Sequence, residues 1–215
     1  MAIFEGASIA ITEKQFAEPK VLALALLCRT LSHLKGLGAV AKLGLAVEAR
    51  LLARACYENM FCVGGLVEKG DKFVAVMYDD ELRSLRSRGQ FVLDKVGPLD
   101  GHGAEFSDRL RARLDEMKAR RPKAKLLNPK DAAGLSAMEQ GYLFYSQLSG
   151  DAAHPSITAL KRHLLIVREN GEHVACLDVQ PLERGEEIAD TIDIACNAAL
   201  GVLVGVKASV TLHQS

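Results

Sequence analysis

The chain has 215 residues, and its 27 basic and 27 acidic side chains give a formal net charge of zero. This balance removes the usual electrostatic argument for binding nucleic acid or an anionic membrane. Hydrophobic residues make up 49% of the sequence and aromatic residues only 5%. We therefore expect a sizeable core that is filled mainly by Leu, Ala and Val.

The charges are unevenly placed along the chain. Eight arginines crowd the middle, between residues 83 and 121, while acidic residues mark the last segment. The run RLRAR at residues 109–113 has the composition of a phosphate-binding patch, but a solvated helix face is the favoured interpretation.

The five cysteines indicate free thiols. Their number is odd, no pair has C-x-x-C spacing, and all lie in apolar surroundings, which is typical of buried thiols in a reducing cytosol.

The first 18 residues are expected to form an N-terminal arm. Glu5, Glu13 and Glu18 precede the first apolar run, so no signal peptide is expected. No uncharged run reaches the roughly 20 residues that a membrane span needs. We predict a cytoplasmic protein that does not enter a membrane.

Two helices are expected in the next part of the chain. Pro19 suits the first turn of a helix, which we expect to run to about Leu34 and to be broken by Gly36 and Gly38. A second helix at about residues 40–63 is apolar on nearly every side, which is typical of a central core helix.

Charged residues on this second helix form a stripe. Arg50, Arg54 and Glu58 follow one another at steps of four, so they share one helix face. If the stripe faces solvent, it contributes only a few tenths of a kcal/mol. If it faces inward, Arg54 and Glu58 must be paired and hydrogen-bonded, because an unpaired buried charge is too costly.

A third helix is predicted after a glycine-rich turn. Gly64, Gly65 and Gly70 indicate the turn, and Asp71 can cap a helix that reaches about residue 96. Its buried face is expected to contain Val74, Tyr78, Leu82 and Leu85.

A loop and a basic helix are expected next. Residues 97–103 are rich in glycine and predict the loop, and the helix should run from about Ala104 to Arg121. Residues 122–134, with two prolines and three lysines, are interpreted as a surface linker.

Residues 136–156 gather the polar side chains that most suggest function. Ser136 and Glu139 have the spacing of a capping box, and Gly150 is expected to end the helix that starts there. One face of that helix is apolar at its start and carries hydroxyl groups at its end: Leu135, Met138, Tyr142, Tyr145 and Ser149.

Pro155 suits the first position of a following helix. It also restricts His154 to an extended conformation, which aims the imidazole as a positioned acid, base or donor requires. The alternative for these side chains is a purely structural role, with tyrosines in the core and a histidine in a turn.

The periodicity changes near residue 164. The sequence LLIVRENGEHVACLDV predicts a β-hairpin at residues 164–179 around an Asn170–Gly171 turn. In that register Val167 faces Val174, and Arg168 faces His173.

A long helix is expected at residues 182–213. Its buried side is predicted to contain Ile188, Ile192, Ala195, Ala199, Leu203 and Val206. Gly201 and Gly205 would allow close approach of another helix, so a homodimer through this helix is a further expectation.

Several established chemistries lack their signatures. The six histidines are scattered, so we predict no metal site. No Gly-x-Ser-x-Gly elbow, P-loop or dinucleotide fingerprint appears, and no cofactor is expected. The sequence shows no platform of aromatic and basic residues for single-stranded nucleic acid.

Two motifs together resemble a widespread bacterial family of domains of unknown function. They are Arg54-x-x-x-Glu58 on an apolar central helix and Tyr145-x-x-Leu148-Ser149 followed by His154-Pro155-Ser156. The resemblance covers about residues 20 to 160. It implies an all-helical fold in which five side chains converge between two helices: Arg54, Glu58, Tyr145, Ser149 and His154.

Some relatives in that family are HEPN-like and linked to defence. HEPN-type ribonucleases carry an Arg-x4-His motif on a helix. Arg168 and His173 match this spacing by letter, but they are expected on opposite strands of the hairpin.

The sequence as a whole predicts a mainly α fold: one helical bundle of about six helices with a small β-hairpin. In the first functional hypothesis the polar cluster is a non-catalytic binding or structural centre. Arg54 and Glu58 form a semi-buried pair, Tyr145 and Ser149 donate to it, and His154 senses its charge. Tyr142 is a further candidate ligand-binding residue.

In the second hypothesis the cluster is a hydrolytic site for RNA or a nucleotide. His154 would act as general acid or base, Arg54 would stabilise a phosphate, and Glu58 is the third catalytic candidate. A small anionic ligand or RNA is the expected partner.

Overall fold

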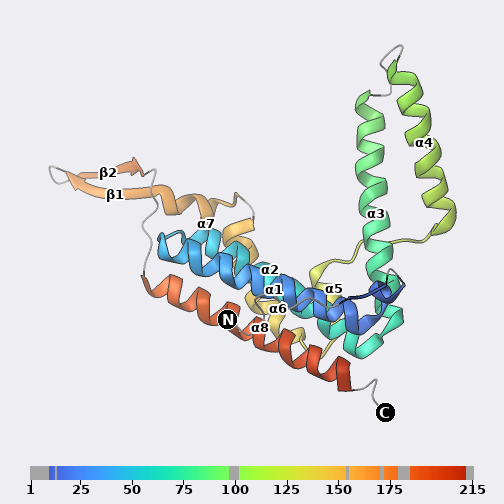
Figure 1. Ribbon diagram of the computed structural model, residues 1–215. Helices are drawn as coiled ribbons and strands as arrows, with labels where there is room; N and C mark the ends of the chain where they lie inside the picture. The colour runs from blue at the N-terminus through green and yellow to red at the C-terminus, as the bar shows by residue number, and fades with distance from the viewer. Residues whose placement is uncertain are drawn as a thin grey trace.

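The computed structural model describes residues 10–12, 14–96, 102–153, 155–169, 172–178 and 185–211. The fold is mainly α-helical with one small antiparallel hairpin, as predicted (Figure 1). Six of the helices in these ranges have seven residues or more, in agreement with the expected bundle of about six.

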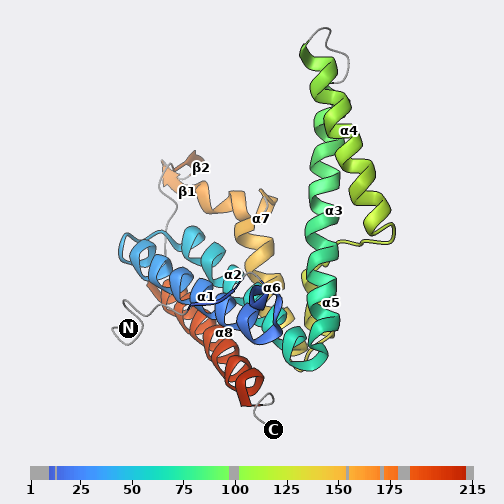
Figure 2. The same ribbon diagram turned by 45° about the vertical axis from the view of Figure 1, so that its right-hand side comes forward.

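Three long helices form the core. α1 (Pro19–Lys42), α2 (Ala46–Lys69) and α8 (Gly185–Thr211) lie side by side, and α2 contacts both of the others (Figures 1 and 2). The completely buried residues of α2 include several small ones: Ala46, Ala49, Ala53 and Cys56. α2 is therefore the predicted central helix, although it lies further along the chain than the expected residues 40–63.

Close packing between α2 and α8 depends on two glycines. A Cβ atom on Gly201 would lie 2.6 Å from Met60 Sδ, and one on Gly205 would lie 2.5 Å from Val63 Cγ1. Both positions therefore need a residue without a side chain. The predicted close approach at these glycines is made by α2 of the same chain.

α1 continues through Gly36 and Gly38, so the predicted break at these glycines is wrong. Each glycine weakens a helix by only about 1 kcal/mol, and packing against α2 outweighs that loss. The helix ends instead at Gly44, whose φ of 76° is left-handed. The amides of Gly44 and Leu45 donate to carbonyls of the last turn at 3.0 Å, as in a Schellman cap.

The glycines near the end of α2 have two different roles. Gly70, with φ of 52°, forms the turn into the next helix. A Cβ atom on Gly64 would lie 2.6 Å from Ser136 Cβ, and one on Gly65 would lie 2.2 Å from Phe73 Cε2. Gly64 and Gly65 are therefore sites of close packing inside α2, and the predicted turn at these two residues is wrong.

α3 (Asp71–Val96) and α4 (His102–Arg120) form an antiparallel pair that projects from the core (Figures 1 and 2). Both helices were predicted, but α3 leaves the core after its first turns. Val74 is buried, whereas Tyr78 and Leu85 of the predicted buried face are 43% and 38% exposed.

The base of this helical pair is tied to the rest of the chain. Arg121 Nη1 lies 2.8 Å from Asp79 Oδ1, and the Leu127 amide donates to Asp80 Oδ1 at 2.8 Å. In the expected linker, α5 (Pro129–Gly134) buries Ala132 and Ala133 against the core.

The polar segment after α5 is less regular than predicted. Ser136 Oγ accepts a hydrogen bond from the amide of Met138, two residues on, so the expected capping box is replaced by a tighter turn. α6 (Tyr142–Leu148) follows, and a π-helical turn (Ser149–Ala153) continues it through Gly150. The predicted helix end at Gly150 is wrong.

Ser156 caps the next short helix, α7 (Ile157–Leu160). Its Oγ atom accepts from the Ala159 amide at 3.1 Å and donates to the carbonyl of Gly150 at 2.9 Å. Pro155 therefore precedes the N-cap, and its predicted place as the first helical residue is wrong.

The hairpin consists of β1 (Leu164–Glu169) and β2 (Glu172–Leu177), paired antiparallel. Val167 lies opposite Val174 and Arg168 opposite His173, which is the predicted register. The predicted turn at Asn170–Gly171 lies outside the described residues. Arg168 and His173 therefore lie on strands, as expected.

α8 faces the core mainly through small residues. Ala195 and Val206 are buried, as predicted, but Ile192 and Leu203 are 36% and 48% exposed. Close contact of α8 with α1 and α2 favours small side chains on the face of α8 that lies against the core. Several large apolar side chains of α8 therefore point outward.

α1 and α8 are long and apolar enough, by length and composition, to cross a membrane. Their most apolar windows have mean hydropathies of 1.3 and 1.6 and are 28% and 33% buried. Core helices of water-soluble proteins have the same character, so this finding assigns no location. The cytoplasmic location stays a prediction.

Candidate functional site

Arg54 is the centre of the predicted polar cluster. Its Nη2 atom lies 2.9 Å from Glu58 Oε1, one turn further along α2, and donates a hydrogen bond of 3.0 Å to the hydroxyl of Tyr145 on α6. The guanidinium carbon also lies 5.2 Å from the centre of the Tyr145 ring, within the range of cation–π attraction. Three predicted site residues from two helices are therefore in contact.

Aromatic rings support this cluster from the core side. Tyr142 stacks on Tyr145 with centroids 5.7 Å apart, and Phe61 packs edge-on against Tyr145 at 5.9 Å. The Arg54 and Glu58 side chains are 27% and 35% exposed. The ion pair is therefore semi-buried, and the apolar rings strengthen it relative to a pair in water.

Ser149 does not make its expected contact. Within the described part of the chain, its buried Oγ atom has no hydrogen-bond partner, and neither has Arg54 Nε. The predicted donation from Ser149 to the Arg54–Glu58 pair is absent there. His154 lies outside the described residues, so its approach to Arg54 stays a prediction.

A cleft opens beside Glu58, between α1, α2, α3 and α5. Its volume is about 350 Å³, and its charged lining residues are Arg29, Glu58 and Asp80. Small-molecule sites typically have volumes of about 300–1,000 Å³. Arg54 pairs with one oxygen of Glu58. The Glu58 side chain also forms part of the cleft wall.

Arg29 and Asp80 were missed by the sequence reasoning. Arg29 Nε donates to His33 Nε2 at 3.3 Å, and Asp80 accepts from the Leu127 amide. Arg29 is a lone cation within the apolar run LALLCRTL, which is a signal that could have singled it out. Asp80 belongs to a run of three acids and carries no such signal.

Two side chains near the charged residues of the cleft have shifted pKa values. Burial and the positive charge of Arg29 lower the pKa of His33, against the opposing effect of Glu58. Burial and the carboxylates of Glu58 and Asp80 raise the pKa of Cys62 to about 11. Because the thiolate is the reactive form of cysteine, Cys62 is an inert thiol at neutral pH.

A comparison with known protein families matches residues 20–173 to the Family of unknown function (DUF5677). The chain belongs to this family. The sequence-based resemblance to a family of unknown function is thereby confirmed. The region matched to DUF5677 contains Arg54, Glu58 and Tyr145, and its description names no activity. No curated protein and no solved structure gives a significant match.

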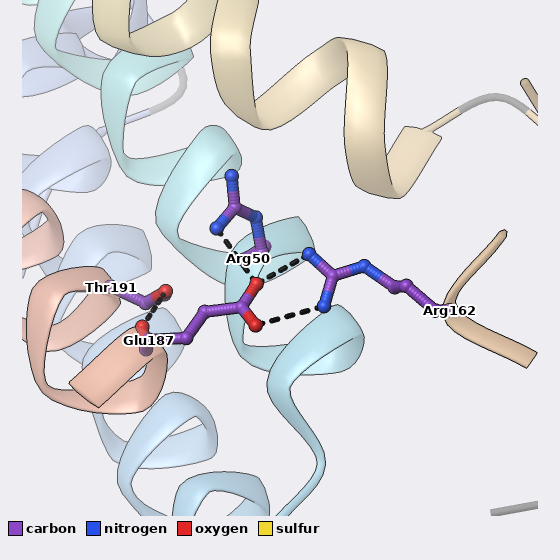
Figure 3. A network of polar contacts seen from close by, with 4 residues as sticks. All are labelled: Arg50, Arg162, Glu187 and Thr191. Carbon is purple, nitrogen blue, oxygen red and sulfur yellow. Dashed lines mark hydrogen bonds and ion pairs between the residues drawn. The ribbon is translucent and has the colours of Figure 1, made fainter. Parts of the chain in front are cut away.

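A second charged cluster joins the DUF5677 region to α8 (Figure 3). Arg50 Nη1 lies 3.0 Å from Glu187 Oε1, and Arg162 donates to both oxygens of the same carboxylate. These three side chains are 18–19% exposed. Thr191 Oγ1 donates to the Glu187 carbonyl at 2.7 Å within the first turns of α8.

This cluster brings together segments that are far apart in the sequence. Arg50 belongs to α2, Arg162 precedes the hairpin, and Glu187 begins α8. Two guanidinium groups share one carboxylate, so the cluster helps to fix the hairpin segment and α8 on the core. The sequence reasoning named Arg50 but neither of its two neighbours, because no local pattern pairs them.

Proposed function

We propose that this member of the DUF5677 family is a non-catalytic binding protein, and that the cleft beside Glu58 holds a small polar ligand. The position of Glu58 supports the proposal, because Arg54 orients its carboxylate at the cleft wall. Arg29 and Asp80 add a positive and a negative charge to the other walls. An amino acid or a related zwitterion would match this arrangement.

The cluster behind the cleft would act as a support. Tyr145 accepts a hydrogen bond from Arg54, and Arg54 in turn pairs with Glu58. The orientation of the carboxylate is thereby set before a ligand arrives, which lowers the entropic cost of binding. The ligand's cationic group would bind Glu58 and Asp80, and its anionic group would bind Arg29.

Thermal unfolding with a panel of amino acids and related zwitterions tests this proposal. A ligand at a hundredfold excess over its Kd stabilises the folded state by about 2.7 kcal/mol, which raises Tm by roughly 5–10 °C for a chain of this length. Glu58→Gln and Arg29→Gln are each expected to abolish most of the increase. Glu68→Gln is the matched control, because Glu68 is an exposed carboxylate on the same helix.

Two results would contradict the binding proposal. One is a panel in which every compound leaves the Tm of the wild type unchanged, and the other is an equal shift in Glu58→Gln. The alternative, a HEPN-like ribonuclease or nucleotide hydrolase in bacterial defence, is tested by incubation with RNA and nucleotides. If the wild type turns over RNA or a nucleotide and the folded variants Arg54→Ala and His154→Ala do not, the site is hydrolytic and the binding proposal is wrong.

We also propose a homodimer through α8, on the basis of its outward face. Four large apolar side chains at helical spacing are 36–64% exposed: Ile192, Leu200, Leu203 and Val204. A second copy would cover this face in a symmetric contact.

Light scattering should then give twice the mass of one chain, and the double variant Leu200→Glu/Val204→Glu should give a monomer. Leu126→Glu, at an exposed leucine outside α8, is the control, and a monomeric wild type would exclude the dimer.

A further inference from the structure

Residues 82–125, which include the outer part of the α3–α4 pair, carry a net positive charge. From Leu82 to Lys125 the sequence contains twelve arginines and lysines and six aspartates and glutamates, a net charge of +6. The chain as a whole is neutral, so the rest of it carries −6. We call residues 82–125 the arm.

The shape of the molecule separates the charges of the arm from those on α1, α2 and α8. The described part of the arm projects into solvent, away from α1, α2 and α8 (Figures 1 and 2). Asp79 lies at its base, where it is engaged by Arg121. At physiological ionic strength, charges separated by more than about 8 Å are largely screened from each other, so the acids of α1, α2 and α8 do not cancel the field of the arm. Asp79, Asp80 and Glu81 are closer, because they precede Arg83 by one turn or less on α3.

Some arm arginines pair with acids on their own helix. Arg109, Arg111, Arg113 and Arg120 of α4 each lie within 4 Å of a carboxylate one turn away. These pairs are the solvated helix face expected from the RLRAR run. Arg83 and Lys118 do not take part in these pairs, and Arg86 donates one N–H to the Arg121 carbonyl at 3.4 Å.

Those cations line a groove between the two helices. The groove has a volume of about 460 Å³, and its cationic lining residues are Arg83 and Arg86 of α3 and Lys118 of α4. Asp94 and Asp115 also line it, and Asp94 accepts a hydrogen bond from Gln90 at 2.9 Å. Three cations against two carboxylates leave the groove lining with a net charge of +1.

An exposed aromatic ring lies in the same groove. Phe91 lines it and is 64% exposed, more than the other phenylalanines that the structure describes. The ammonium group of Lys95 lies 5.8 Å from the ring centre, adding a further cation beside the ring.

We propose that this groove binds single-stranded nucleic acid, with phosphates on Arg83, Arg86 and Lys118 and an unpaired base stacked on Phe91. A cationic groove with an exposed aromatic side chain is the combination that holds single strands without sequence preference. The sequence did not reveal this platform, because Phe91 and Lys118 meet only when α3 and α4 pair. The assignment is independent of the cleft beside Glu58.

Fluorescence anisotropy of the full chain with a labelled single-stranded RNA 20-mer tests the proposal. For three phosphate contacts, log K should fall with log salt concentration with a slope of about −2. The double variant Arg83→Glu/Lys118→Glu should bind at least about tenfold more weakly at 50 mM salt. Arg86 is left intact because it donates to the Arg121 carbonyl.

Phe91→Ala should weaken binding of the single strand by about fivefold or more, since stacking contributes 1–3 kcal/mol per base. It should leave the binding of a duplex of the same length unchanged. Lys35→Glu/Lys42→Glu is the matched control, because it makes the same change of net charge at exposed sites on α1. Circular dichroism confirms that each variant is folded.

Three results would overturn the proposal. The first is a wild type that does not bind the single strand at 50 mM salt. The second is an equal loss of affinity in the arm and control variants, which would indicate a non-specific charge effect. The third is displacement of RNA more effectively by an acidic peptide or by phosphatidylserine vesicles than by unlabelled RNA, which would assign the arm to a different partner.

Discussion

Gly65→Ala is expected to lower the free energy of unfolding by about 2–3 kcal/mol. The added Cβ atom would lie 2.2 Å from Phe73 Cε2, and Phe73 is only 1% exposed. The ring cannot turn toward solvent, so α2 and the first turn of α3 must separate. Denaturant unfolding followed by circular dichroism measures the loss, and Tm should fall by roughly 5–10 °C.

Gly38→Ala is the matched control for this prediction. Gly38 also lies inside a helix, α1, but an added Cβ atom there would meet nothing within 4 Å. The change should raise the free energy of unfolding by about 0.5–1 kcal/mol, because alanine favours the helix more than glycine does. The same substitution would thus have opposite signs at the two sites. Equal effects at both would contradict the packing argument.

Glu187→Gln is expected to lower the free energy of unfolding by about 2 kcal/mol. Breaking a buried ion pair costs about 3–5 kcal/mol, and these side chains are 18–19% exposed, so the effect should be smaller. Arg50 and Arg162 would lose the carboxylate that they share, and the first turn of α8 would lose a favourable negative charge. Denaturant unfolding measures the change.

Hydrogen exchange should locate the effect of this substitution. Arg162 lies two residues before β1, so amides of the hairpin should exchange faster in Glu187→Gln, while those in the middle of α2 should change least. Glu116→Gln is the control, because Glu116 pairs with exposed arginines and should alter stability by less than about 1 kcal/mol. Similar losses in both variants would show that the shared carboxylate has no special structural role.

The predicted features that the structure confirms are local in origin. Arg54 and Glu58 meet because residues four apart on a helix are neighbours, whatever else surrounds them. The hairpin register follows from the length of its turn, and Val167 lies opposite Val174 as expected. The central place of α2 follows from its all-round apolar sequence.

Several of the wrong predictions concern residues with more than one structural use. Glycine suits a turn, but it also suits the close approach of two helices. Gly70 has the first role, while Gly64 and Gly65 have the second. The sequence does not distinguish these roles, since the second depends on Ser136 and Phe73, which arrive from other parts of the chain.

The amino-acid sequence by itself determined the helical class, the central helix, the hairpin register and the Arg54–Glu58 pair. Only the tertiary structure decided that Tyr145 accepts a hydrogen bond from Arg54 where it was expected to donate to the pair, that Arg29 and Asp80 share a cleft with Glu58, and that Arg162 meets Glu187. The physical reason is the range of the interactions. Helix spacing and turn geometry act over a few residues, whereas these contacts depend on how α1, α2, α3, α6 and α8 pack together.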